Sequence, residues 1–161
     1  APTKTGEHAD GAHARYRGEL GLVTWGQNVW GRPMPRKSAL VLPELVGGMP
    51  RVSRPPLVAN SMLICAREHR LDPDAHMILV SREPTLDAAT GRASLDFGGR
   101  VTCPSVKNVQ LVVSGTDTIV LQFGRTGKDS FVLDFTWPLS PMQAFGFALS
   151  SLSHKLASEG G

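Results

Sequence analysis

The most constraining feature of this sequence is an apolar run near its end, from Met142 to Leu152. Ser140 followed by Pro141 predicts a helix start, because serine is a good N-cap and proline needs no N–H in the first turn. Apolar or small side chains cover every face of this helix, and only Gln143 is strongly polar. At roughly 15 residues it would be about 22 Å long, too short to span a bilayer comfortably. We therefore expect protein to surround it.

The segment before this helix predicts a meander of antiparallel strands. Ala93–Phe97 alternates polar and apolar side chains. After a second turn, Phe131, Leu133 and Phe135 alternate with Val132, Asp134 and Thr136. Between them, Val106–Val113 and Thr118–Phe123 flank the hairpin signal Ser114–Asp117. A sheet wrapped around the helix would give these strands a core and cover the helix on all sides.

The first half of the chain has weaker patterns. Leu20–Trp25, Ala39–Leu42 and Met77–Val80 predict short strands. Pro43–Pro56 contains four prolines and two glycines and predicts a loop. Leu57–Ala66 is apolar and stays ambiguous between helix and strand.

Positive charge is concentrated in the first third of the 161-residue chain. Residues 1–56 hold eight Lys and Arg against four Asp and Glu, whereas residues 57–161 hold nine against ten. A localised basic surface suits an anionic partner such as phospholipid headgroups or nucleic acid. The same pattern is also typical of a solvated face without a partner.

Composition favours a globular protein without enzymatic chemistry. The chain is 41% apolar and 19% charged, and its polar start, which lacks Met, suggests a fragment without a secretory signal. Cys65 and Cys103 have no CxxC spacing and favour a reducing compartment. The five histidines have no metal-site spacing, and Ser105 and Ser130 lack a hydrolase context. We expect no catalytic residue, metal or cofactor.

A long and regularly spaced series of motifs covers most of residues 17–157. The series comprises Asn28-Val29, Gly31, Pro35–Lys37, Pro43, Phe97–Val101, Ser105–Leu111, Gln122–Arg125, Lys128–Phe131, Leu133–Phe135, Pro138–Ser140, Gln143–Phe145, Ala148–Leu152 and Lys155–Ala157. On these residues the chain resembles the C-terminal part of a domain of the Tubby family.

The resemblance implies a mainly β (α+β) fold. It would be an antiparallel β-barrel closed around a central apolar C-terminal helix, here lacking its early strands. Residues 17–157 would form this part of the domain, with a flexible tail or loop at 1–16 and a tail at 158–161. The early strands are expected in a longer parent chain. Without them the barrel would have open edges and a partly uncovered helix.

The resemblance also implies a binding site for phosphatidylinositol 4,5-bisphosphate in membranes. Family members hold this headgroup with Lys and Arg at the mouth of a basic pocket, and the matching run places one phosphate-contacting arginine at Arg17. A guanidinium fork can hold two phosphate oxygens at once. Arg36 and Lys37 are expected to add charge to the same face, although all three positions are also typical of structural cations at strand starts. Arg125 and Lys128, which flank a turn, and Lys107, in a predicted strand, are predicted to be structural.

By resemblance, the expected function is a phosphoinositide-binding, membrane-associated adaptor linked to ciliary trafficking or signalling. Its location would be cytoplasmic, peripheral at a membrane or in a cilium, with the nucleus as an alternative. Its expected protein partners are ciliary transport or axonemal proteins. The alternative is a scaffold docked in a larger ciliary or axonemal assembly without lipid binding. Nucleic-acid binding ranks lower, because the basic patch is weak and no reading helix is visible.

Overall fold

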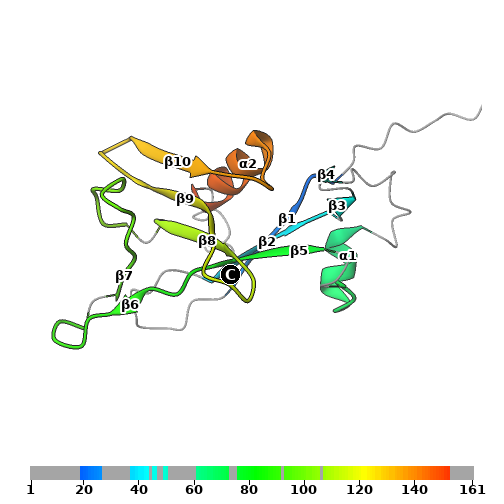
Figure 1. The fold of residues 1–161 in the computed structure, drawn as a ribbon, viewed down its shortest axis with the longest axis horizontal. Helices are drawn as coiled ribbons and strands as arrows, with labels where there is room; N and C mark the ends of the chain where they lie inside the picture. Colours follow the sequence, from blue (N-terminus) through cyan, green and yellow to red (C-terminus); the bar gives the residue numbers. More distant parts are fainter. Residues whose placement is uncertain are drawn as a thin grey trace, which may run out of the picture.

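A computed structural model describes residues 19–26, 37–43, 45–46, 49–50, 61–72, 76–91, 93–105 and 107–152. Its main element is a six-stranded antiparallel sheet with the order β1-β2-β5-β8-β9-β10 (Figure 1). The strands are β1 (Leu22–Trp25), β2 (Ser38–Leu42), β5 (Met77–Ser81), β8 (Val109–Val113), β9 (Ile119–Arg125) and β10 (Phe131–Phe135). Separate two-stranded pairs are β3 (Leu45–Val46) with β4 (Met49–Pro50) and β6 (Thr85–Leu86) with β7 (Ala93–Ser94). The helices are α1 (Met62–Arg67) and α2 (Pro141–Leu152).

The predicted meander is confirmed for its last three strands. β8 pairs with β9, and β9 pairs with β10, both antiparallel. The β8–β9 turn needs a left-handed residue, which Gly115 supplies with a φ of 80°. The Thr116 N–H donates to the Val113 carbonyl at 2.9 Å and closes the turn. Consecutive hairpins thus build half of the sheet from local sequence.

The core lies between one face of this sheet and α2. Phe147 is 1% exposed and stacks on Trp25 of β1, with ring centroids 5.7 Å apart. Ala144 and Ala148 are buried on the same helical face. The strand residues of this core are Leu40, Leu42, Leu79, Val109, Leu111, Val120, Leu121 and Phe123.

A reciprocal capping box begins α2, as the Ser140-Pro141 pair predicts. The Gln143 N–H donates to Ser140 Oγ at 3.3 Å, and the Ser140 N–H donates to Gln143 Oε1 at 2.9 Å. Gln143 Nε2 also donates to the Leu20 carbonyl at 2.6 Å, just before β1. The one strongly polar side chain of the helix therefore ties it to the first strand of the sheet.

The expected closed barrel is not present: within the described residues the sheet is open, with β1 and β10 at its two edges. Six strands about 4.8 Å apart cover roughly 29 Å, whereas a circle about 10 Å from a helix axis measures roughly 63 Å. The sheet therefore covers only one side of α2. On the other side Met142, Phe145 and Leu149 are 65%, 55% and 48% exposed.

Smaller expectations are also corrected. The predicted loop at Pro43–Pro56 contains the short β3–β4 pair. The ambiguous Leu57–Ala66 contains all of α1 except its last residue, Arg67, with Ser61 as the N-cap. Of the strand predicted at Ala93–Phe97, only Ala93–Ser94 pairs, with β6, because Asp96 turns its carboxylate onto the Gly98 N–H at 2.8 Å. β8 begins at Val109, three residues later than predicted.

Candidate functional site

The loop at 97–100, part of one family motif, is a tight turn rather than a ligand loop. Gly98 and Gly99 have φ values of 58° and 76°, a conformation that glycine adopts without strain. The Arg100 N–H donates to the Phe97 carbonyl at 3.1 Å. The Gly98 N–H donates to Asp96 Oδ1 at 2.8 Å. The two glycines serve to reverse the chain.

After the turn, Arg100 and Val101 fasten the loop to the face of the sheet opposite α2. Arg100 Nε and Nη2 donate to the two carboxylate oxygens of Asp134 at 3.0 and 2.8 Å. Val101 packs onto Gly124, where an added Cβ would lie 2.7 Å from Val101 Cγ1. The Phe97–Val101 motif therefore contacts the family motifs that lie in β9 and β10.

A row of polar side chains crosses this face in register. Gln110, Gln122 and Asp134 lie opposite one another on β8, β9 and β10. Gln122 Nε2 donates to Asp134 Oδ2 at 2.9 Å. The hydrogen bonds from Arg100, and then from Gln122, lower the pKa of Asp134 below its ordinary value. A carboxylate in an otherwise apolar strand usually faces solvent or pairs with a neighbour, and Asp134 pairs with Arg100 and Gln122.

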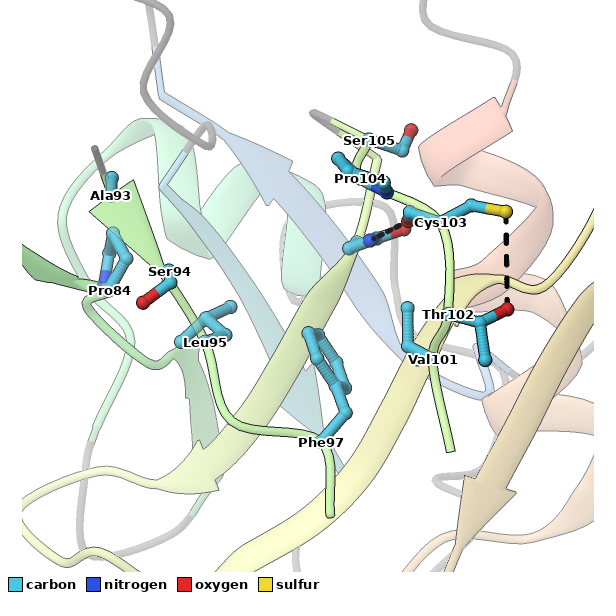
Figure 2. Close-up of a pocket in the computed structure, with 11 residues that line it drawn as sticks. Pro84, Ala93, Ser94, Leu95, Phe97, Val101, Thr102, Cys103, Pro104 and Ser105 are labelled. Carbon is cyan, nitrogen blue, oxygen red and sulfur yellow. Dashed lines mark hydrogen bonds between the residues drawn. The ribbon is translucent and has the colours of Figure 1, made fainter. Parts of the chain in front are cut away.

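A pocket of about 290 Å³ lies between the segment before the turn at 97–100, which includes Ala93–Leu95, and the segment after it, Val101–Ser105 (Figure 2). Its lining combines apolar side chains such as Phe97 and Val101 with the hydroxyl of Thr102 and the thiol of Cys103, whose Oγ1 and Sγ are 4.0 Å apart. The other lining residues are Pro84, Ala93, Ser94, Leu95, Pro104, Ser105 and Asn108. None of the eleven is Lys, Arg, His, Asp or Glu. The pocket therefore has no side chain that neutralises a phosphate.

Several of the described Lys and Arg residues lie beside strand ends at one end of the six-stranded sheet. Because neighbouring strands are antiparallel, the starts of β2, β8 and β10 and the ends of β5 and β9 share one edge. In Figure 1 the β9–β10 turn and the chain after β5 lie on the left, and α1 lies on the right. We call the cations at this edge the basic rim: Lys37, Arg82, Lys107, Arg125 and Lys128. Glu83 and Asp129 are the carboxylates beside them.

Lys37 is the described member of the predicted lipid site. It directly precedes β2, its side chain is 81% exposed, and Nζ lies 2.7 Å from Glu83 Oε1. The hydrogen bond to Glu83, together with the attraction between the charges, raises the pKa of Lys37 and lowers that of Glu83. A single carboxylate thus already compensates the cation that was predicted to meet a phosphate.

The other two predicted residues, Arg17 and Arg36, lie outside the described residues, so their grouping with Lys37 stays a prediction. Glu19 is the described residue nearest to Arg17 in sequence. Its Oε2 accepts a hydrogen bond from the Met62 N–H of α1 at 2.7 Å, at the end of the sheet opposite Lys37.

Lys107 and Lys128, like Arg125, were predicted to be structural, and Arg82 was assigned no role from the sequence. Arg125, which we predicted to be structural, does hold its own turn: Nε donates to the Gly127 carbonyl at 2.6 Å and Nη2 to the Lys128 carbonyl at 2.9 Å. In the sequence each of these cations lies next to the start or the end of a strand. Grouping them at one edge requires the order and direction of the strands, which the sequence alone does not give.

Among the described residues, no group of three or more His, Cys, Asp and Glu side chains is placed to hold a metal ion. No helix in this part of the chain combines the length and the apolar character needed to cross a membrane.

The fold and this edge together define an antiparallel β-sheet domain with one apolar helix on its inner face and a cationic rim. The chain belongs to the Tub family, whose sequence model matches residues 2–154. It is 40% identical to Tubby-related protein 2 of Homo sapiens over 148 residues, which is 91% of this chain and 28% of that protein. It is also 40% identical to Tubby protein homolog 1 of Caenorhabditis elegans over 152 residues, 91% of this chain and 36% of that protein. The chain thus spans about a third of the length of these relatives.

Proposed function

We propose that this chain is part of a phosphoinositide-binding, membrane-associated adaptor of the Tubby type, linked to ciliary trafficking or signalling. Its family membership carries the proposal, because the resemblance implies phosphatidylinositol 4,5-bisphosphate as the ligand. Charge supports it: residues 1–56 carry a clear excess of Lys and Arg, and Lys37 is accessible at the start of β2. On this proposal the protein is cytoplasmic and peripheral at a membrane or in a cilium.

The proposed phosphate-binding residue is Arg17, with Arg36 and Lys37 adding charge. Liposome flotation with and without phosphatidylinositol 4,5-bisphosphate tests this role for the wild type and for Arg17→Ala. The control is Arg67→Ala, which removes an exposed cation from α1. We expect the lipid to increase flotation of the wild type and of the control, and Arg17→Ala to lose that increase. Equal flotation under all conditions would sink the lipid proposal.

The uncovered side of α2 favours a second candidate function, a scaffold that docks in a larger assembly. Met142, Phe145 and Leu149 expose an apolar stripe of the kind that marks contact surfaces. Cross-linking in ciliary extracts distinguishes the two functions: a scaffold would give the same protein contacts with and without the lipid, and an adaptor would not.

A further inference from the structure

The basic rim extends across the sheet from Lys37, the described member of the predicted lipid site. Lys37 is bonded to Glu83, which follows Arg82 at the end of β5. The Arg82 N–H donates to the Gln110 carbonyl of β8 at 2.8 Å. From β2 to β10 there are four steps between neighbouring strands of about 4.8 Å each, so the rim extends over roughly 19 Å. The rim is therefore longer than a single phosphate group and could contact several anionic groups at once.

Lys107 and Lys128 are held at the same edge by backbone contacts. The Lys107 N–H donates to Ser105 Oγ at 3.1 Å, and the Lys128 carbonyl accepts from Arg125. Within the described part of the chain, neither ammonium group lies within 4.0 Å of a carboxylate. Their charges are therefore available to a partner, unlike that of Lys37.

We propose that the basic rim faces the anionic surface of a membrane, with Lys107 and Lys128 as its attracting residues and Glu83 as a built-in counter-charge. This rests on the proposed function and adds a second, non-specific contact to it. A row of separate, flexible ammonium groups suits a surface of many headgroups better than it suits one buried anion. The neighbouring pocket has no charged lining residue and is not the phosphate site.

Glu83 distinguishes this rim from a merely basic surface. Its side chain is 75% exposed and lies within hydrogen-bonding distance of Lys37, so the pair is nearly neutral as seen by a membrane. Replacing Glu83 by Gln removes the repulsion between its carboxylate and the leaflet and leaves the Lys37 charge uncompensated. Because the change affects an exposed side chain, the fold is expected to tolerate it.

Vesicle sedimentation of the whole chain tests the proposal with three lipid mixtures: phosphatidylcholine alone, the same with phosphatidylserine, and the same with phosphatidylinositol 4,5-bisphosphate. Each basic group near an anionic leaflet changes partitioning about fivefold. We expect Lys107→Gln/Lys128→Gln to partition roughly 30-fold more weakly, and Glu83→Gln about fivefold more strongly, into both anionic mixtures. The matched control, Arg67→Gln/Arg70→Gln, removes two charges near α1 and should change partitioning little.

The outcomes separate this proposal from the proposed function. If the wild type binds phosphoinositide vesicles but the rim variants and the α1 control behave alike, the rim proposal is wrong and the proposed function stands. Suppose instead that the rim variants change binding to the same extent on both anionic mixtures, and that the wild type binds phosphoinositide vesicles no better than phosphatidylserine vesicles. The rim proposal is then supported and the specific lipid site is wrong. No binding to any anionic vesicle, or tighter binding of a short DNA duplex through the same rim residues, would overturn the rim proposal.

Discussion

Gly124 shows how little space separates the Phe97–Val101 loop from β9. Its Cα faces the branched side chain of Val101, so even a methyl group would collide with Cγ1 and Cγ2. Val101 cannot turn away easily, because its Cβ itself lies 3.1 Å from the added atom. The requirement for glycine therefore comes from packing at this position, in a strand where glycine is otherwise unfavourable.

We expect Gly124→Ala to lower the free energy of unfolding by about 1–3 kcal/mol, as overpacking does in other cores. Urea denaturation gives this value. Val101→Ala should relieve the collision, so the double variant Gly124→Ala/Val101→Ala should cost less than the sum of the two single changes. Strictly additive costs would show that the two residues do not share a contact.

The Arg100–Asp134 pair predicts a pH dependence of stability. The pKa of Asp134 is lowered in the folded state, so its contribution is fully present above the unfolded pKa near ~3.9 and is lost as the pH falls through the folded pKa. The stability difference between the wild type and Asp134→Asn should be constant near neutral pH and should shrink below about pH 4. A difference that stays constant into acid would contradict the pair's role.

The kind of environment that each of these residues needs follows from the sequence, but the partner of each residue does not. A carboxylate in an apolar strand usually pairs or faces solvent, and the pair of Asp134 with Arg100 fits that general rule. The partner could not be named, since 34 residues separate the two positions. For the same reason Arg82, Lys107 and Lys128 were not predicted to lie beside Lys37: their common edge depends on strand order, which local patterns do not contain.

At the level of elements, α2 was the most predictable. Its start follows from local chemistry at Ser140 and Gln143. The predicted cover on all sides is not present: the Phe147 face is buried, whereas Phe145 and Leu149 are about half exposed. The sheet around it was less predictable, because a six-stranded order places β2 beside β5 and β5 beside β8 across long connections. The β3–β4 and β6–β7 pairs, with two residues per strand, are too short to give a periodic signal.

Two phenylalanines on α2 test which side of the helix stabilises the fold. Phe147 is 1% exposed and stacks on Trp25, so Phe147→Ala should cost about 3–5 kcal/mol in the free energy of unfolding. Phe145 is 55% exposed on the same helix and is the matched control, expected to change stability by less than about 0.5 kcal/mol. Both are measured by chemical denaturation. Equal losses would mean that both sides of the helix are covered in solution.

At the scale of the whole molecule, a half-covered helix leaves apolar surface in water. Phe135 at the end of β10 and Trp137 before α2 are exposed as well, at 40% and 62%. The sheet also ends in two described edges, β1 and β10. Contiguous apolar surface of this kind favours association, because burial against another surface removes it from water.

We therefore expect the chain to self-associate as its concentration rises, and Phe145→Glu/Leu149→Glu to shift it toward a monomer without lowering its melting temperature. Both side chains are about half exposed, so the changes act on association rather than on the core. Sedimentation velocity over a wide concentration range measures the effect. Leu86→Glu is the matched control, since Leu86 is 56% exposed but belongs to β6. A wild type that stays monomeric, or a control that dissociates the protein equally well, would show that the stripe on α2 is not the contact surface.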